Sequence, residues 1–215
     1  DVYHAICDLD DDRHFVEKSL VALNITVDIN PAEVDRIPKT GPLLVVANHP
    51  FGAIDGLILM SILHRARPDS KVMANFLLAR IEELRELLIC VDPFEGAEAQ
   101  ARNLAPLKQA IRHLKDGHAL GTFPAGEVAH FDFHQRAIVD PSWSSTVGRL
   151  ARITGATVLP LYFHGRNSQL FNLLGMIHPR LRTAMLPREL LKKKAAKITV
   201  RIGHPIPATR LAEFN

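Results

Sequence analysis

An unbroken run of five apolar residues at 43–47, followed at once by polar residues, constrains the fold of this chain more than any other feature. A short, continuous apolar run is typical of a strand buried on both faces of a parallel sheet. Asn48, His49 and Pro50 end the run, and an apolar pattern of helical length resumes at 54–63. This order puts the turn at the carboxyl end of the strand, where open α/β sheets bind their ligands.

Two residues around this turn carry chemistry. His49 lies at the end of the strand, and Asp55 falls in the first turn of the following helix. A carboxylate that holds the Nδ1 proton of a histidine leaves Nε2 free to take a proton from a hydroxyl. The simpler alternative is that Asp55 only caps its helix and that His49 is an ordinary loop residue.

Strands and helices alternate along the rest of the chain. Further strands are expected at 25–29, 71–74, 88–91, 118–123, 157–163 and 198–202, and helices at 3–23, 54–64, 77–88, 98–114, 144–154, 170–177 and 181–191. Pro160 interrupts one strand, which predicts an edge position or a bulge. The alternation predicts an α/β fold with a mostly parallel sheet flanked by helices. We expect one domain, in which residues 1–40 are a helical and strand lead-in and residues 41–215 form the core.

Composition bounds the class of protein. A chain of 215 residues that is 47% hydrophobic and 23% charged can bury a proper core and is not disordered. No run approaches the ~18 apolar residues that a membrane-spanning helix needs. Cys7 and Cys90 lie far apart in apolar surroundings, so free buried thiols are expected rather than a disulfide.

The formal charge of +3 is unevenly spread. Between residues 180 and 201 a single acid, Glu189, stands among eight basic residues: Arg180, Arg182, Arg188, Lys192, Lys193, Lys194, Lys197 and Arg201. Such a segment suits anionic partners such as lipid headgroups or an acidic carrier protein, or it is only a solvated helix face. Nucleic acid is not expected, because aromatic residues are few and no binding motif is present.

Two strand ends resemble motifs of one family. Asn48-His49-Pro50-Phe51-Gly52-Ala53-Ile54-Asp55-Gly56 and Phe123-Pro124-Ala125-Gly126-Glu127 are similar to the first and third motifs of the glycerolipid acyltransferases, the lysophosphatidate-acyltransferase-like superfamily. Residues 158–161 and 202–206 resemble its fourth motif and its closing strand. The ordered set covers residues 40–207. It is most similar to the hemolysin-like branch and to the acyltransferases that complete ornithine lipids.

The resemblance implies an O-acyltransferase that moves a fatty acyl group from an acyl thioester to the hydroxyl of a lyso-lipid. The donor would be acyl-carrier protein or acyl-CoA, the acceptor a lyso-ornithine lipid or a lysophospholipid, and no cofactor or metal is expected. His49 would act as general base and Asp55 would orient it. Substrate-binding residues are expected in both motifs and one loop: Asn48, Pro50, Phe51, Gly52, Phe123, Pro124, Ala125, Gly126, Glu127 and Arg166. Backbone amides of 124–127 are candidates for stabilising the oxyanion. The alternatives are a thioesterase or lipid esterase and a non-catalytic, hemolysin-like lipid-binding protein.

The first motif departs from the family's spacing. Five residues, not four, separate His49 from Asp55, and Gly52 is expected to absorb the extra residue in the turn. A literal match to the pattern is His64 with Asp69. That pair falls where a helix runs into a loop, and no strand aims it at a cleft.

The third motif departs in its chemistry. The family's Glu and Arg positions hold Ala125 and Val128, and Glu127 stands at the Thr position. In phosphate-binding members that Arg contacts the acceptor's phosphate, which Val cannot do. The second motif, expected near 90–96, also lacks an evident Arg. The acceptor is therefore expected to lack glycerol phosphate, as a zwitterionic amino-acid lipid does, unless Arg166 or Arg136 serves instead.

The sequence contains one other candidate site, a metal site at 130–134. His130, Asp132 and His134 would project on one face of an extended segment at a workable metal spacing. Apart from Glu127, no Cys or carboxylate lies close to them in the sequence, and the family needs no metal. A serine hydrolase is not expected, because Gly-x-Ser-x-Gly is absent.

A lipid acceptor implies a peripheral enzyme at the cytoplasmic face of a membrane. The segment 171–194 is the expected attachment. Its apolar residues would enter the interface and its basic residues would face anionic headgroups: Phe171, Leu173, Leu174, Met176 and Ile177, with Arg180, Arg182, Lys192, Lys193 and Lys194. The alternative is that these apolar residues pack on the sheet.

Overall fold

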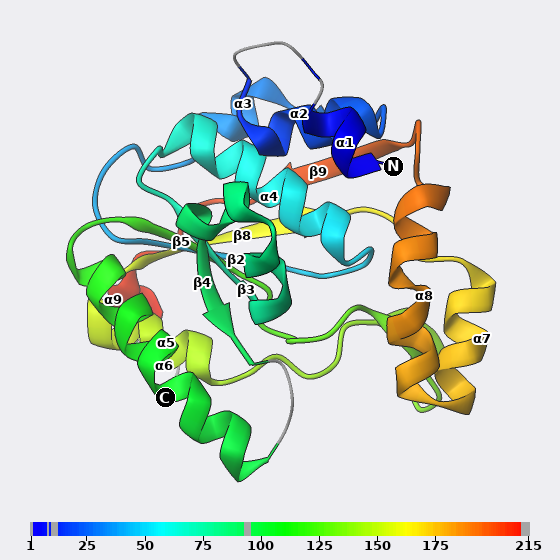
Figure 1. Cartoon of the computed structure of the whole chain (residues 1–215). Helices are drawn as coiled ribbons and strands as arrows, with labels where there is room; N and C mark the ends of the chain where they lie inside the picture. Colours follow the sequence, from blue (N-terminus) through cyan, green and yellow to red (C-terminus); the bar gives the residue numbers. More distant parts are fainter. Residues whose placement is uncertain (1, 8, 10–12, 93–95, 212–215) are drawn as a thin grey trace.

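The centre of the domain is a seven-stranded sheet (Figure 1). The structure is a computed structural model and describes residues 2–7, 9, 13–92 and 96–211. The strand order is β1-β9-β8-β2-β5-β3-β4. The strands are β1 (Thr26–Ile29), β2 (Leu43–Ala47), β3 (Lys71–Asn75), β4 (Leu88–Val91), β5 (Ala119–Thr122), β8 (Thr157–Phe163) and β9 (Lys197–Ile202). All neighbouring pairs are parallel except β8 with β9, which confirms the predicted α/β fold with a mostly parallel sheet.

Strand β2 is buried along its whole length and divides the core into two layers. Leu43, Val45 and Ala47 face one cluster, and Leu44 and Val46 face the other, because side chains alternate along a strand. The first cluster includes α2 (Phe15–Ala22) and α4 (Ala53–Ala66), and the second includes α5 (Ala97–Lys115) and α6 (Thr146–Thr154). Helices therefore cover both faces of the sheet, as predicted.

The remaining elements lie around this centre. They are α1 (Val2–Cys7), α3 (Pro31–Val34), α7 (Gln169–Ile177), α8 (Pro179–Lys192), α9 (Ala208–Leu211), the 3₁₀ helices η1 (Phe76–Arg80) and η2 (Glu82–Leu87), and a hairpin of β6 (His130–Asp132) and β7 (Ala137–Val139). Helices α7 and α8 pack on each other and form a hairpin beyond the carboxyl end of β8 (Figure 1). Within the described part of the chain, no helix combines the length and the apolar character needed to cross a membrane.

The predicted lead-in is joined to the same sheet. Strand β1 pairs in parallel with β9, and α2 packs against α4. The single helix predicted over 3–23 is wrong, because α1 ends at Cys7 and α2 starts only after His14. The Nδ1 of His14 accepts the N–H of Val16 and caps α2.

A second predicted helix, over 77–88, is also wrong. Asn75 accepts the N–H of Leu77 and starts η1, and Ile81 then takes an extended conformation that separates η1 from η2. Apolar residues three and four apart are compatible with either kind of helix, so their spacing did not distinguish the two. Both cysteines are free, as expected, but Cys7 is exposed and Cys90 is half-buried.

Pro160 lies in an inner strand, so the predicted edge position is wrong and the predicted bulge is right. Strand β8 pairs with β9 from Leu161, opposite Ile202, and a bridge joins Val158 to Ile206. Three residues of the partner segment therefore face two residues of β8. The N–H of Gly203 donates to the carbonyl of Pro160 over 2.8 Å. This irregularity accommodates a residue that has no N–H of its own.

Candidate active site

Asp55 and His49 meet at the carboxyl end of β2. The Oδ2 atom of Asp55 lies 3.0 Å from Nδ1 of His49 and accepts the N–H groups of Phe51 at 2.7 Å and Gly52 at 3.0 Å. Asp55 sits in the first turn of α4 and is fully buried. Its carboxylate therefore caps the helix and contacts the histidine at the same time, so the two sequence-based interpretations are compatible.

Gly52 takes up the extra residue between the two. Its φ of +93° is a conformation that favours glycine, and it immediately precedes α4. A Cβ at this position would lie 3.1 Å from Leu186 and 3.4 Å from Val128, so the turn is also closely packed. The positive φ and the close packing both favour glycine here.

The environment of Asp55 sets the chemistry of the pair. Burial raises the pKa of the Asp55 carboxyl above its ordinary value, and the hydrogen bonds from His49, Phe51 and Gly52 oppose that rise. The N–H groups of Phe51 and Gly52 both donate to Oδ2 and favour the carboxylate, and a carboxylate facing Nδ1 favours the tautomer of His49 with its proton on Nδ1 and its lone pair on Nε2. The second oxygen, Oδ1, is buried and has no partner among the described residues.

Three contacts hold His49 in place. Its ring stacks on Phe123, with centroids 4.1 Å apart and planes 24° apart. Its carbonyl accepts the N–H of Ala129 over 2.8 Å, and its own N–H donates to Oδ1 of Asp140 over 3.1 Å. The other oxygen of Asp140 accepts the indole N–H of Trp143. Asp140 lies 91 residues from His49 in the sequence and in no recognised motif, so sequence reasoning missed it.

The third motif forms a tight turn beside the histidine. The N–H of Gly126 donates to the carbonyl of Phe123 over 3.0 Å and is used inside the turn. Pro124 has no N–H, whereas the amides of Ala125 and Glu127 donate to no partner among the described residues. The amides of Ala125 and Glu127 are therefore the remaining candidates for stabilising the oxyanion, and this role stays a prediction.

Asn48 is engaged with the backbone of the neighbouring strand. Its side-chain N–H donates to the carbonyl of Phe163 over 3.0 Å, and its Oδ1 accepts the N–H of Phe163 over 2.7 Å. These bonds tie the end of β2 to the end of β8. One N–H of the amide is left for the predicted substrate contact.

The other predicted binding residues differ in exposure. Pro50 and Phe51 are buried under the turn, and Arg166 is exposed on the loop after β8. Glu127 forms an ion pair of 2.5 Å with Arg182, which is itself only 8% exposed. The expectation that Arg182 faces lipid headgroups is therefore wrong, because the third motif already pairs it.

His64 and Asp69, the literal match to the first motif, do not contact each other in the structure. The ring of His64 lies against that of His14, with centroids 4.7 Å apart. Asp69 accepts two bonds from the guanidinium of Arg67. His64 and Asp69 therefore have different partners, and neither joins the other.

The rival metal segment is also engaged in local bonds. Asp132 accepts the N–H groups of His134 and Gln135 and so stabilises the turn of the β6–β7 hairpin. His130 bonds to the carbonyl of Val128 through Nδ1. In the described ranges of the chain, no three His, Cys, Asp or Glu side chains are placed to hold a metal ion.

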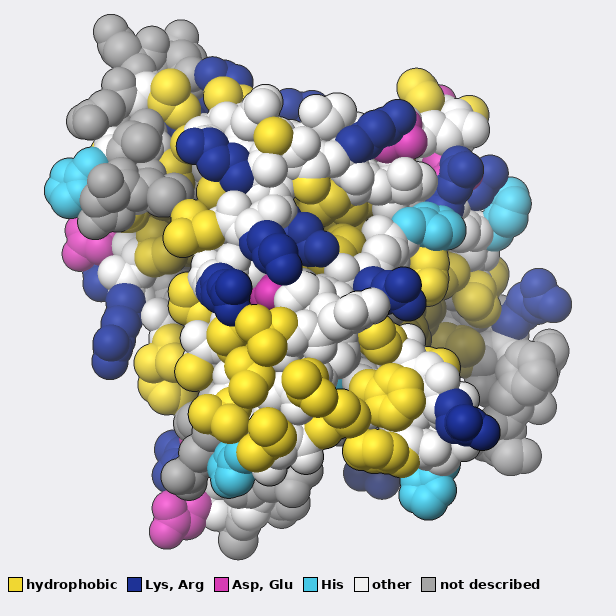
Figure 2. Space-filling view, turned by 90° about the vertical axis from the view of Figure 1, so that its right-hand side faces the viewer, with side chains coloured by type: hydrophobic (Ala, Val, Ile, Leu, Met, Phe, Trp, Pro, Cys, Tyr) yellow, Lys and Arg dark blue, Asp and Glu magenta, His cyan; other side chains and the backbone are white. Residues whose placement is uncertain are grey.

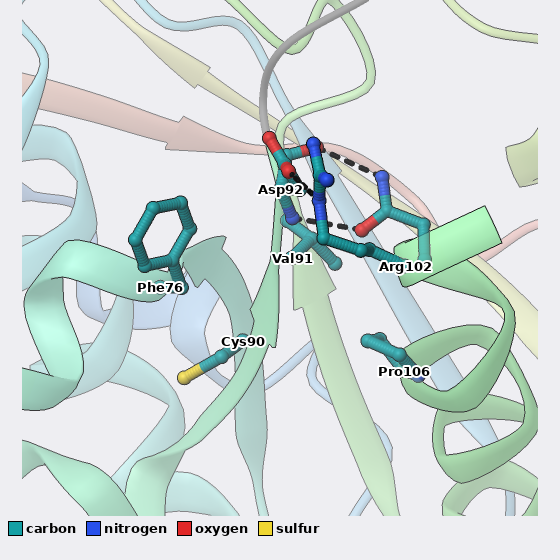
Figure 3. A pocket seen from close by; sticks show the side chains of 7 residues that line it. Phe76, Cys90, Val91, Asp92, Arg102 and Pro106 are labelled. Carbon is teal, nitrogen blue, oxygen red and sulfur yellow. Dashed lines mark hydrogen bonds and ion pairs between the residues drawn. The ribbon is translucent and has the colours of Figure 1, made fainter. Parts of the chain in front are cut away.

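A cavity of about 380 Å³ lies at the carboxyl end of β4. His49 and Asp55 lie at the carboxyl end of β2, on the same edge of the sheet. The cavity is lined by Phe76, Cys90, Val91, Asp92, Arg102, Asn103 and Pro106 (Figure 3). Strand β4 is three strands from β2, or about 14 Å at ordinary strand spacing. The cavity is therefore separate from the pair of His49 and Asp55, which we call the dyad. Arg102 reaches into the cavity from α5 and pairs with Asp92 at 2.6 Å, so a guanidinium lies beside the expected second motif although the sequence of 90–96 contains no Arg.

Known proteins are similar to this chain in sequence and in fold. Its sequence is 30% identical to a lyso-glycine lipid O-acyltransferase of Phocaeicola vulgatus over 90% of this chain and 68% of that protein. The enzyme of the same name from Bacteroides thetaiotaomicron is also 30% identical, over 90% and 70%. The solved structure of the 1-acyl-sn-glycerophosphate acyltransferase PlsC from Thermotoga maritima superposes with a TM-score of 0.55 at 18% identity, covering 97% of this chain and 77% of that one.

A protein-family model described as Acyltransferase matches residues 4–214, almost the whole chain. The resemblance inferred from the motifs is therefore confirmed. The chain belongs to the acyltransferase family and is an acyltransferase.

Proposed function

We propose that this enzyme transfers a fatty acyl group from an acyl thioester of acyl-carrier protein or coenzyme A to the hydroxyl of a lyso-lipid with an amino-acid headgroup. The observation that carries the proposal is the 3.0 Å contact of His49 Nδ1 with Asp55, which leaves Nε2 as a base. The names of the two relatives support a lyso-lipid acceptor, and they favour glycine over the ornithine headgroup expected from the motifs.

The reaction follows from this geometry. Nε2 of His49 takes the hydroxyl proton as the oxygen attacks the thioester carbonyl, and Asp55 stabilises the imidazolium that forms. The tetrahedral intermediate collapses, the C–S bond breaks, and the imidazolium returns the proton to the leaving thiolate. The products are an ester and a thiol, and no covalent enzyme intermediate is needed.

The third motif supports an acceptor without phosphate at this position. Val128 stands where the family's Arg is expected, is 8% exposed and packs near Gly52. The neighbouring cation, Arg182, is paired with Glu127. Neither Val128 nor the paired Arg182 therefore supplies the phosphate contact that the family's Arg makes.

The test uses a labelled acyl thioester with and without N-acyl amino-acid lyso-lipids, read for product lipid and for free fatty acid. We expect product lipid only when an acceptor is present. His49→Ala should lower that rate by about 10²–10⁴-fold, because the general base is lost. Free fatty acid without an acceptor would identify a thioesterase or esterase instead. A near wild-type rate in His49→Ala would overturn the mechanism.

We also propose that the enzyme works at the cytoplasmic face of a membrane, where acyl thioesters are present. The apolar face of the α7–α8 hairpin is the proposed contact: Leu170, Leu173, Met176, Ile177 and Leu181, which are between 38% and 68% exposed. Figure 2 supports this assignment, since hydrophobic side chains gather on the lower half of that face and Lys and Arg gather above them. Such a pairing suits anionic lipid.

Burial excludes Phe171 from the predicted attachment, in addition to Arg182. Phe171 is fully buried in the core, so its predicted insertion is wrong. Lys193 is half-buried, whereas Lys192 and Lys194 are exposed. The side chain of Arg180 lies outside the described part of the structure.

Vesicle sedimentation tests this location. We expect binding to vesicles that contain anionic lipid, weakened by salt, because exposed basic residues contribute about 1 kcal/mol each near such a surface. Lys192→Gln with Lys194→Gln should weaken binding, and Ile177→Glu should weaken it further. Binding that responds neither to lipid charge nor to salt would contradict the electrostatic contribution.

A further inference from the structure

Lys193 brings a positive charge to the turn that carries the dyad. Its Nζ lies 5.0 Å from the centroid of the Phe51 ring and donates to the carbonyl of Arg166 over 2.9 Å. Phe51 itself donates its N–H to the carboxylate of Asp55. Lys193 therefore contacts a residue that bonds directly to the catalytic carboxylate.

This charge has no acidic partner within ion-pair distance among the described residues. The nearest acid in the sequence is Glu189 of α8, which is buried and accepts both the N–H and the hydroxyl of Ser168. Burial lowers the pKa of Lys193, and the charges of Glu189 and Asp55 oppose that change. A partly desolvated ammonium without a counter-ion is stabilised when an anion binds to it.

The ammonium has donors to spare. Of its three N–H groups one is used by the carbonyl of Arg166, which leaves two for a ligand. Arg166 is itself exposed on the loop after β8, and a guanidinium can bind a carboxylate through two parallel bonds. Figure 2 shows Lys and Arg side chains grouped on this face, above the apolar surface that we propose contacts lipid.

We propose that Lys193, together with Arg166, binds the carboxylate of the acceptor lipid's headgroup while His49 deprotonates its hydroxyl. This inference rests on the proposed function, since an amino acid acylated on its nitrogen keeps a free carboxylate. The shared chemistry is an anionic headgroup, and a phosphate is the other anion that such a site accepts. The pair is a binding site and takes no part in proton transfer.

The test compares three water-soluble acceptors: an N-(hydroxyacyl)glycine, its methyl ester and a lysophosphatidate of similar chain length. The methyl ester removes the charge and leaves the reacting hydroxyl unchanged. Wild-type enzyme should favour the acid over the ester by about 10- to 100-fold in kcat/KM, as a lost charge-assisted contact predicts. Lys193→Met should bring this ratio close to one, and Lys193→Arg should keep most of it. Lys115→Met, at an exposed lysine of α5 outside both proposed binding surfaces, should keep the wild-type ratio.

The outcomes separate the two proposals. Equal use of acid and ester by the wild type, or an unchanged ratio in Lys193→Met, overturns the headgroup site and leaves the acyltransferase proposal intact. A preference for lysophosphatidate over the acid assigns the site to phosphate and overturns the carboxylate. Transfer to none of the three, with thioester hydrolysis alone, overturns the proposed function itself. If Lys193→Met fails to fold, the wild-type ratio and Lys193→Arg decide the matter.

Discussion

The carboxylate of Asp55 bonds to His49 through the same oxygen that caps helix α4. The start of the helix and the orientation of the imidazole are therefore set by one atom. Because Gly52 at φ +93° precedes the helix, the carboxylate reaches back over five intervening residues. The backbone of this turn and the contact between His49 and Asp55 are therefore coupled.

Asp55→Asn should nearly abolish activity and leave the fold intact. The amide oxygen can take the place of Oδ2 and keep the bonds to His49, Phe51 and Gly52, but a neutral amide no longer stabilises the imidazolium that forms during the reaction. The rate should fall by up to ~10⁴-fold, as in the Ser-His-Asp triad. Acyl transfer and thermal unfolding measured side by side check this expectation. A variant within ten-fold of wild type would show that the carboxylate only caps the helix.

Gly165→Ala should destabilise the protein and reduce its activity together. Gly165 has φ +129°, and a Cβ there would collide with Cζ of Phe51, whose N–H holds Asp55. We expect a loss of about 1–3 kcal/mol in the free energy of unfolding. Gly56→Ala is the matched control, because Gly56 lies inside α4 with open space around it and should gain about 0.5–1 kcal/mol. Urea unfolding of both variants measures the difference; two equal midpoints would argue against a closely packed Phe51.

His113 should make stability fall at mildly acidic pH. Its ring is partly buried and bonds to the carbonyl of Ala119 over 2.9 Å. Burial lowers its pKa from the ordinary value of 6.5, and the charge of His118 lowers it further. The unfolded chain therefore binds the proton more tightly, so the stabilisation is present above about pH 6.5 and is lost as the pH falls through the folded-state pKa.

His113→Gln tests that assignment. Glutamine keeps a donor for Ala119 but does not titrate. Between about pH 7.5 and pH 5.5 the wild-type unfolding temperature should drop more than that of the variant. Parallel pH profiles would mean that His113 does not contribute.

The local part of the site could be predicted from the sequence. Strand β2, the turn and α4 are contiguous, so one apolar run and one helical pattern place His49 and Asp55 at the same strand end. The sheet followed in the same way from the alternation of elements. These features depend on near neighbours in the chain, and near neighbours are what sequence patterns record.

The rest of the site depends on residues that are distant in the sequence. Asp140 reaches His49 from 91 positions away, and Arg182 reaches Glu127 from 55. Neither partner could be chosen until the fold had brought the segments together. The prediction that Phe171 enters a membrane was wrong for a related reason. An apolar helix pattern does not show which of its residues are covered by the rest of the protein. Leu173 and Ile177, the neighbours of Phe171 on the same helix, are exposed.

Asp140 should act as a positioning residue for His49. Its Oδ1 accepts the backbone N–H of His49, and its Oδ2 accepts the indole N–H of Trp143. Asp140→Ala removes the acceptor on the histidine's backbone, so we expect kcat to fall by about ten-fold, the equivalent of one hydrogen bond to a charged group. Asp140→Asn keeps an oxygen for that N–H and should recover most of the activity. Trp143→Phe breaks only the second bond and should stay closer to wild type. Both kcat and the unfolding temperature are measured for all three variants. A purely structural role would lower the unfolding temperature in step with kcat, and no recovery in Asp140→Asn would count against positioning through this bond.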